Sequence, residues 1–374
     1  MDSSQKHIAF VCSSVSWGGL EMNILRYAEW MSNESFKTTL WCVENSPLHE
    51  AVEKTSLAVI TIPRHRKYFA FGKALRLAGQ FKKHKVDIVW IRDTRDIDTC
   101  GLAVRLNGHA KLVYQQAMQL GIDKRDIFHT MRFRRIDLWI STLQFLADQV
   151  KKRTRFPEER IAIVPLSIDT QKYQNLIPNA MAKDIFGIPK DAIAMGVVGR
   201  IDPLKGQEFV IRAHAKLVNE GHPFHLLIVG EPTRNEGEDY LNLLKSLPKE
   251  LGTENHVVFS PFRTDIETAY AAMDVFIMPS QGETFGMVTI EAMAAGLPVV
   301  GTNSSGTPEI LGFGNHGLLY NPGDQETFKS NIKELLAKER RLDLGLKGQK
   351  FATEHFSRKT VVDKLRKLAV DILD

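Results

Sequence analysis

Residues 278–309 read MPSQGETFGMVTIEAMAAGLPVVGTNSSGTPE, and the charged side chains among them are Glu283, Glu291 and Glu309. The pattern predicts an apolar strand before Glu283 and an apolar helix that begins near Met287. A carboxylate on such a helix is costly to bury unless hydrogen-bond donors satisfy it. The two adjacent hydroxyls of a ribose would satisfy both oxygens of Glu291. This strand, loop and helix are therefore predicted to bind a nucleotide at the edge of an α/β sheet.

The turn between the first two glutamates has the character of an anion site. Thr284-Phe285-Gly286-Met287 would direct backbone N–H groups and the positive end of a helix dipole at an anion. Gly286 would let a phosphate approach the backbone closely, because it has no Cβ. We therefore predict that Phe285, Gly286 and Met287 contact a phosphate group. An ordinary helix start whose glutamates face solvent is the alternative.

A second segment, GRIDPLKG at 199–206, follows another predicted strand. Arg200 and Lys205 would lie at the carboxyl edge of a parallel sheet, where ligands of such sheets bind. A guanidinium with its fork of donors and an ammonium point charge together suit a diphosphate. A surface turn with a basic residue at each end is the alternative.

A glycine pair, Gly18-Gly19, lies between the first predicted strand and the first predicted helix. Such a pair can cradle a phosphate or let a sugar approach the backbone. The sequence is not G-x-G-x-x-G, so the dinucleotide fingerprint of a dehydrogenase is poorly matched. A plain tight turn is the alternative.

Short runs rich in Val and Ile alternate with amphipathic stretches of helical length, which is typical of parallel sheets covered on both faces. The pattern stops over 168–180 and then restarts, so we expect two doubly wound α/β domains facing each other across a cleft. The expected parts are a Rossmann-like domain at 1–170, a second at 171–356 and a final helix at 357–374. The predicted strands span 7–13, 37–43, 57–63, 86–92, 110–115, 136–142, 161–164, 193–199, 224–230, 256–260, 275–279 and 298–302, and the predicted helices span 20–31, 70–83, 97–107, 143–153, 206–220, 239–248, 287–295, 323–338 and 357–373.

The composition is that of a soluble globular protein, with 43% hydrophobic and 25% charged residues. Cys12, Cys42 and Cys100 are odd in number and far apart, which favours free thiols in a reducing compartment. The first residues resemble neither a signal peptide nor a membrane span. A cytoplasmic protein is therefore expected.

The net charge of +5 is unevenly distributed. Residues 1–165 carry 26 Lys and Arg against 17 Asp and Glu, whereas residues 166–374 carry 23 against 27. A basic half favours an anionic partner, either a phosphorylated or lipid-linked acceptor or the surface of an anionic membrane. Nucleic acid is not expected, because the basic clusters are not interleaved with aromatic residues. A solvated face without a partner is the alternative. The clusters are 64–67, 82–85, 132–135 and 151–155.

The motifs G-G-x-E, G-R-x-D-x-x-K-G and S-x-x-E-x-F-G-x-x-x-x-E-A-M-A-x-G-x-P-V-V occur in this order along nearly the whole chain. This order resembles the retaining glycosyltransferases of family 4, which have the GT-B fold. The resemblance implies transfer of a hexosyl unit, with retention, from a nucleotide diphosphate sugar that is UDP-linked by family frequency. A glycan, glycolipid or lipid-linked acceptor in bacterial envelope polysaccharide or lipopolysaccharide synthesis is the implied acceptor. Association with the membrane would be weak and peripheral.

The resemblance also implies roles for individual residues. Arg200 and Lys205 would hold the diphosphate, Glu283 would contact hydroxyls of the transferred sugar, and Glu291 would bind the ribose. Gly18-Gly19 would lie under the donor phosphates. These roles leave no carboxylate beneath the anomeric carbon, which favours front-face attack without a covalent intermediate. Side-chain cations would stabilise the departing diphosphate, so no metal or other cofactor is expected.

The chain departs from the family pattern in its first domain. Many relatives carry a histidine after a mid-sheet strand, close to the reacting sugar, and the corresponding stretch here, 113–117, reads VYQQA. Gln116, or Arg92 and Asp93 in a preceding loop, would then supply polar groups on the acceptor side. The last helix is implied to cross back to the first domain.

Other functions stay open. Asp96-Ile97-Asp98 has the D-x-D spacing of metal-dependent glycosyltransferases, although it falls where a helix begins. His222 and His225 are a zinc alternative that lacks further ligands in sequence. The same fold serves nucleotide-sugar epimerases, and a relative without the histidine could bind a nucleotide sugar without transferring it.

Overall fold

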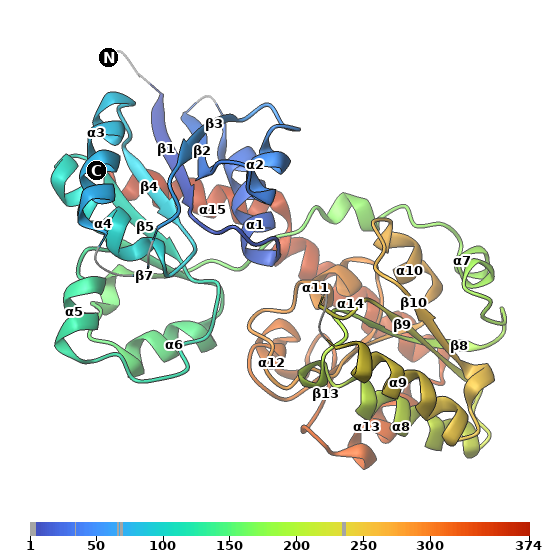
Figure 1. The fold of residues 1–374 in the computed structure, drawn as a ribbon. Helices are drawn as coiled ribbons and strands as arrows, with labels where there is room; N and C mark the ends of the chain where they lie inside the picture. Colours follow the sequence, from blue (N-terminus) through green and yellow to red (C-terminus); the bar gives the residue numbers. More distant parts are fainter. Residues whose placement is uncertain (1–4, 34, 66, 68–69, 234–236) are drawn as a thin grey trace. The chain divides into compact units, whose positions relative to one another are not determined.

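The computed structural model describes residues 5–33, 35–65, 67, 70–233 and 237–374. The chain divides into two compact units: unit 1 comprises Met1–Pro165 with Lys359–Asp374, and unit 2 comprises Leu166–Arg358. Each unit is built on a parallel sheet with helices around it (Figure 1). The predicted α/β class with two Rossmann-like parallel sheets is therefore confirmed. Within the described ranges, no helix combines the length and the apolar character needed to cross a bilayer.

The sheet of unit 1 has the strand order β3-β2-β1-β4-β5-β6-β7. Its neighbouring strands pair in parallel, with Ile8 of β1 opposite Thr38 of β2 on one side and Ile88 of β4 on the other. The chain reverses its direction of travel across the sheet between β1 and β4, and ligands of doubly wound sheets bind beyond the carboxyl ends of strands at such a point. The strands are β1 (Lys6–Cys12), β2 (Phe36–Val43), β3 (Ala58–Ile62), β4 (Ile88–Ile91), β5 (Lys111–Gln115), β6 (Leu138–Ser141) and β7 (Ile161–Ile163).

Helices cover both faces of this sheet and close its core around large buried side chains such as Trp41, Phe81 and Trp139. The α3 and α4 helices pack against each other, and they lie side by side in Figure 1. The α15 helix belongs to unit 1, where Arg366 Nη2 donates to the carbonyl of Trp30 at 2.6 Å. The helices are α1 (Gly19–Met31), α2 (Pro47–Val52), α3 (Phe71–Lys83), α4 (Asp96–Asn107), α5 (Ile127–Phe133), α6 (Gln144–Arg153) and α15 (Arg358–Asp371), with a short 3-10 turn η1 (Glu158–Arg160).

Unit 2 repeats the plan with the strand order β10-β9-β8-β11-β12-β13, so its reversal lies between β8 and β11. Its core joins the sheet to α8, α9, α13 and α14. The elements are β8 (Ile193–Val198), β9 (Phe224–Val229), β10 (Val257–Ser260), β11 (Val275–Met278), β12 (Val299–Thr302), β13 (Leu318–Tyr320), α7 (Asn179–Ile185), α8 (Gln207–Asn219), α9 (Glu238–Glu250), α10 (Ile266–Ala272), α11 (Met287–Ala294), α12 (Thr307–Ile310), α13 (Gln325–Glu334) and α14 (Lys338–Phe356), with 3-10 turns η2 (Thr170–Tyr173), η3 (Pro203–Lys205), η4 (Glu254–His256) and η5 (Gly312–Gly314).

Each predicted strand and helix has a counterpart in the structure, with ends shifted by a few residues. The sequence patterns missed β13 and the helices α2, α5, α7, α10, α12 and α14. The segment 168–180, predicted to be aperiodic, contains η2 and the start of α7, and Ile168 pairs with Ser357 in an isolated bridge. The three cysteines are buried and free, as expected.

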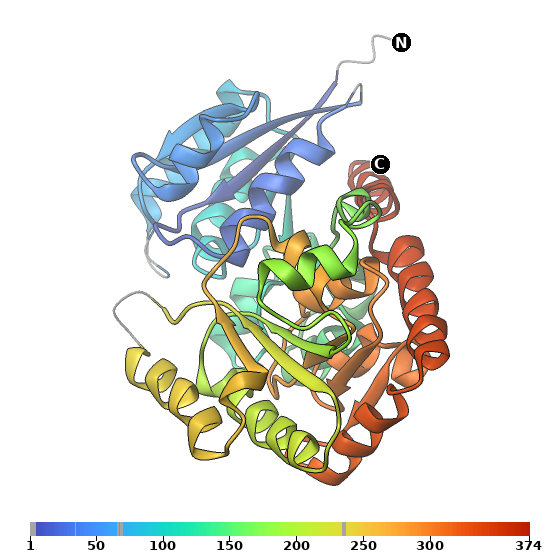
Figure 2. The same cartoon turned by 90° about the vertical axis from the view of Figure 1, so that its right-hand side faces the viewer.

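The longest missed helix, α14, packs on α11 and is the orange-red helix of Figure 2. Two glycines weaken its helical pattern in the sequence. A Cβ on one of them, Gly345, would lie 2.1 Å from the carbonyl oxygen of Gly296, so only glycine permits this close approach.

Candidate active site

The turn after β8 positions the two cations of the 199–206 segment. The carboxylate of Asp202 accepts from the backbone N–H of Leu204 at 2.9 Å and from Arg200 Nη2 at 2.8 Å. The turn ends at Gly206, whose φ of 74° suits glycine, and a Cβ there would lie 2.6 Å from the carbonyl oxygen of Pro279. Because residue 206 is glycine, the turn can approach Pro279 closely, and Lys205 then lies next to the loop that follows β11.

Lys205 and Glu283 form an ion pair across these two loops, with 2.7 Å between Nζ and Oε2. The lysine side chain is 31% exposed and the glutamate side chain 18% exposed, so both remain accessible to a ligand. The backbone N–H of Gly306 donates to the carbonyl of Glu283 at 3.1 Å, which ties the loop to the start of α12. Two residues that the motifs placed at one site thus lie in contact.

The start of α11 lies next to this pair. Gly286 precedes the helix with a φ of 87°, and its carbonyl accepts from the N–H of Thr289 at 3.0 Å. The N–H groups of Met287 and Val288, which cannot bond within the helix, have no backbone acceptor among the described residues. The first turn of α11 carries no acidic side chain, so the helix leaves donors and a positive dipole end at this point.

Phe285 has a different position from its neighbours. Its side chain is 4% exposed and its ring lies edge-on to that of Phe356, 5.9 Å between centroids. The side chain therefore belongs to the core of unit 2, and the backbone is the part of Phe285 that could meet a donor.

Glu291 lies on α11, and its carboxylate has a protein partner that the sequence did not suggest. The hydroxyl of buried Tyr270, on α10, donates to Glu291 Oε2 at 2.9 Å. Burial, reinforced by the charge of Glu291, raises the pKa of Tyr270 well above its ordinary value, so this hydroxyl stays protonated. Each carboxylate oxygen can accept two hydrogen bonds, so the contact with Tyr270 leaves room for a ribose, and the ribose interaction of Glu291 stays a prediction.

In unit 1, the glycine pair lies at the start of α1. Gly18 is the residue before the helix, and a Cβ there would lie 3.7 Å from Glu21 Oε2. A Cβ on Gly19 would meet nothing within 4 Å, so this part of the backbone is open to a ligand. Glu21 is 5% exposed, and it is the glutamate of the G-G-x-E motif.

Arg92 and Asp93 follow β4, and each side chain forms hydrogen bonds inside unit 1. Arg92 is 2% exposed, its Nη1 donates to Gln115 Oε1 at 3.2 Å, and burial lowers the pKa of its guanidinium. The carboxylate of Asp93 accepts from Arg95 Nε at 2.9 Å. The prediction that Arg92 reaches an acceptor is therefore not supported by this geometry, because its side chain lies inside unit 1.

Gln116 is also placed inside unit 1, with no exposed surface. Its Oε1 accepts from Trp139 Nε1 at 3.1 Å and from Ser141 Oγ at 2.9 Å, and its Nε2 donates to the carbonyl of Met118 at 2.9 Å. Because these bonds use both ends of the amide, the predicted acceptor-side role of Gln116 is also unsupported.

The two metal alternatives do not assemble a ligand set. Asp96 accepts from Ser13 N–H at 3.1 Å and lies 2.9 Å from His65 Nδ1, whereas Asp98 pairs with arginines. His222 lies 3.8 Å from a carboxylate oxygen of Glu220. In the part of the chain that the structure describes, no three His, Cys, Asp or Glu side chains are arranged to hold a metal ion.

Two family models match successive parts of the chain. Residues 17–172 match the model described as Glycosyltransferase Family 4, and residues 179–351 match the model described as Glycosyl transferases group 1. The D-inositol 3-phosphate glycosyltransferase of Corynebacterium urealyticum is 33% identical over 205 residues, which are 53% of this chain and 47% of that protein. The chain thus spans about half the length of the curated relatives it matches.

Nearly the whole chain aligns in three dimensions with proteins of known structure. A glycosyltransferase from Rickettsia africae aligns over 99% of both chains with a TM-score of 0.88 and 20% identity. Anabaena Alr3699/HepE, solved in complex with UDP, aligns over 98% of this chain and 100% of its own with a TM-score of 0.83 and 19% identity. At such identities the likeness establishes the GT-B fold.

Proposed function

Because the chain belongs to the family 4 glycosyltransferases (glycosyl transferases group 1), we propose that it moves a hexosyl unit from a UDP-sugar to an acceptor. The observation that carries this proposal is the accessible Lys205–Glu283 pair, 2.7 Å apart, beside the N-terminus of α11, whose first N–H groups have no backbone acceptor among the described residues. The arrangement offers a cation and backbone N–H donors for a diphosphate and a carboxylate for sugar hydroxyls. The Anabaena neighbour is solved with UDP, which supports this choice of nucleotide.

In the proposed mechanism the anomeric configuration is retained. The acceptor hydroxyl attacks on the face that the diphosphate leaves, and the diphosphate takes the hydroxyl proton as the glycosidic bond to the nucleotide breaks. Arg200, Lys205 and the N–H groups at Met287 stabilise the charge that grows on the diphosphate. Glu283 orients the sugar and Glu291 the ribose. No metal or other cofactor takes part.

The acceptor is proposed to be anionic, either a glycan or a lipid-linked molecule in bacterial envelope synthesis. Basic residues exceed acidic ones within residues 1–165, 26 against 17. The Corynebacterium relative is named for a phosphorylated acceptor, D-inositol 3-phosphate, which supports the same preference. The protein would then act in the cytoplasm or on the inner face of the membrane.

Turnover of a UDP-sugar tests the proposal. Arg200→Ala and Lys205→Ala should each lower kcat by about 10²–10³, the usual cost of removing one donor to a developing charge. Activity should persist in EDTA, and proton NMR of the product should show the donor's anomeric configuration. Loss of activity with chelator, or a glycosyl-enzyme trapped on Glu283, would overturn the mechanism. Binding of UDP-sugars without transfer to any acceptor would favour the alternative, an epimerase or binding relative.

A further inference from the structure

Unit 2 contains a groove at the edge of its sheet opposite the candidate donor site. Its volume is about 660 Å³, within the range of about 300–1,000 Å³ that is usual for small-molecule sites. Ile193 lines the groove at the amino end of β8, and Asp274 and Pro298 line it just before β11 and β12. The candidate donor site follows the carboxyl ends of β8 and β11, so the groove is a separate site.

Apolar side chains form much of the wall of this groove. Ile177 is 40% exposed and Leu342 is 56% exposed, and both line the groove. Exposed apolar surface in a concave site favours a ligand that can cover it with an apolar body of its own. The other apolar side chains of the lining include those of Leu176, Ala271, Met273 and Leu297.

The charged side chains of the groove leave a surplus of positive charge. The carboxylate of Asp274 lies 2.7 Å from Nζ of buried Lys183, so these two charges cancel. The remaining charged residues of the lining are one acidic and three basic residues, Asp191, Lys190, Lys338 and Arg341. Within the described ranges, exposed Lys190 and Lys338 form no ion pair, so both ammonium groups can meet a ligand.

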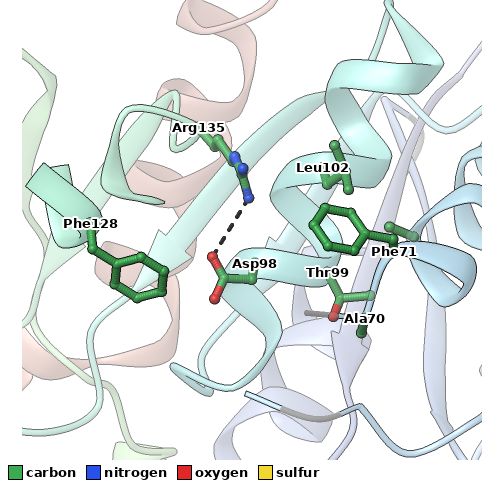
Figure 3. Close-up of a pocket in the computed structure, with 8 residues that line it drawn as sticks. Ala70, Phe71, Asp98, Thr99, Leu102, Phe128 and Arg135 are labelled. Carbon is green, nitrogen blue, oxygen red and sulfur yellow. Dashed lines mark ion pairs between the residues drawn. The ribbon is translucent and has the colours of Figure 1, made fainter. Parts of the chain in front are cut away.

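A hollow in unit 1, between α3, α4 and α5, lacks these properties (Figure 3). Its volume is about 80 Å³, and the charged residues that line it are Asp98 and Arg135, which form an ion pair at 3.6 Å. One carboxylate and one guanidinium leave no surplus charge to select an ion. The groove of unit 2, by contrast, has both the volume and the charge to bind an anion.

The helices beside the groove pack on the two helices of the candidate donor site. The α7 helix packs on α10, and α14 packs on α11. Lys190 lies in the segment after α7 and Lys338 begins α14, so an anion that contacts both lysines would link these two outer helices. The inner helices are already joined, because Tyr270 of α10 donates to Glu291 of α11 at 2.9 Å. Linking the outer helices would therefore also favour the arrangement of α10 and α11 that holds Glu291.

We propose that this groove is a regulatory site for a phosphate monoester with an apolar body, and that its occupation tightens the binding of UDP. A phosphate monoester carries about 1.5 to 2 negative charges near pH 7, which matches the surplus of positive charge in the lining. Its apolar body covers Ile177 and Leu342. The effect on UDP rests on the proposed function, whereas the anion site itself can be tested without any donor.

Calorimetric titration of the full-length protein with 1-naphthyl phosphate tests the site. Lys190→Ala and Lys338→Ala should each weaken binding about fivefold, because each removes an ammonium group that bonds the phosphate. Lys350→Ala, at an exposed lysine of α14 outside the groove, should change affinity less than twofold. Leu342→Ala should weaken binding about threefold. Leu346→Ala, at a leucine of α14 that is 64% exposed and does not line the groove, should leave binding unchanged.

Two further titrations identify the charge and the place of binding. 1-Naphthalenesulfonate has the same rings and a single negative charge, so it should bind at least fivefold more weakly than 1-naphthyl phosphate. Lys205→Ala should bind 1-naphthyl phosphate as the wild type does, because the candidate diphosphate site is not the site of this probe. Loss of binding in Lys205→Ala, equal affinity in the three other lysine variants, or no binding to the wild type would overturn the site.

The regulatory effect is measured by titrating UDP into the protein with and without saturating 1-naphthyl phosphate. UDP should bind about fivefold more tightly when the groove is occupied, and linkage requires UDP to tighten 1-naphthyl phosphate by the same factor. An unchanged or weaker affinity for UDP would overturn the regulatory role. If UDP does not bind the wild type while the groove variants still discriminate, the proposed donor and the regulatory role fail, whereas the anion site stands.

Discussion

Tyr270 and Glu291 form the residue-scale contact with the most direct consequence for the donor. The Tyr270 hydroxyl lies 2.9 Å from Glu291 Oε2 and fixes one carboxylate oxygen. Hydrogen bonds to charged groups contribute about 1.5–3 kcal/mol. Tyr270→Phe should therefore weaken UDP binding roughly tenfold, or about 1.4 kcal/mol, with kcat little changed. Tyr240→Phe, on α9 of the same unit, is the control, and equal affinity in the two variants would exclude a positioning role for Tyr270.

His214 should make unit 2 sensitive to acid. It is fully buried near His225 and His256, and burial lowers the pKa of His214 from 6.5 to about 4. Above pH 6.5 the folded and unfolded states both carry the neutral ring. Below it the unfolded state takes up the proton first, so stability is lost as the pH falls from 6.5 towards 4.

Because of this proton uptake, the free energy of unfolding should be about 2 kcal/mol lower at pH 5.0 than at pH 7.5. Urea denaturation at the two pH values measures the loss, and His214→Gln should reduce it by about that amount. The change His222→Gln, at a partly exposed histidine, should leave the loss as in the wild type. An identical pH dependence in His214→Gln and the wild type would show that His214 is not the titrating group.

Some residues of the candidate site could be predicted from the sequence, whereas others could not. Lys205 and Glu283 follow strands whose carboxyl ends meet at one edge, so the topology alone brings them together. Tyr270 was missed because its contact depends on how α10 packs near α11, which no local pattern encodes. Arg92 and Gln116 also follow strands, but neighbouring side chains bury them.

At the scale of elements, the start of α11 depends on the conformation of Gly286. Its φ of 87° is disfavoured for other residues, and a Cβ would lie 3.2 Å from Glu283 Cγ. Gly286→Ala should cost about 1–2 kcal/mol of stability and should also lower UDP-sugar turnover, because the new methyl displaces Glu283. Gly187→Ala has a φ of 66° with nothing within 4 Å, so it should lose stability alone. Equal turnover in the two variants would contradict this account.

Elements with strong periodicity were predictable, whereas those that depend on tertiary contact were not. The buried strands β1 and β8 stand out as apolar runs. By contrast, α14 is polar and contains Gly345, and glycine is a weak helix former. The contact of that glycine with Gly296 explains its presence, and only the folded chain reveals it.

At the scale of the whole molecule, the basic excess of residues 1–165 predicts weak binding to anionic membranes. Each basic residue near an anionic leaflet contributes about 1 kcal/mol. The expected surface includes the clusters 64–67, of which Arg66 lies outside the described residues, and 82–85. Sedimentation at low salt should show a preference for anionic over neutral liposomes.

Reversing Lys82 and Lys83 to glutamate should reduce this preference, whereas the same double reversal at Lys347 and Lys350 of unit 2 should not. No preference between the two kinds of liposome, or equal effects of the two double variants, would count against a membrane-facing unit 1.

Calorimetric titration of UDP tests the central claim most directly. The claim is that unit 2 binds the donor nucleotide through Arg200 and Lys205. UDP should bind the wild type, and Arg200→Ala and Lys205→Ala should each weaken binding at least tenfold, since each removes a charged hydrogen-bond donor to the diphosphate. Lys216→Ala, at an exposed lysine on α8, should bind UDP as the wild type does. If neither UDP nor GDP nor ADP binds the wild type, or if all three variants bind UDP equally well, the account is wrong.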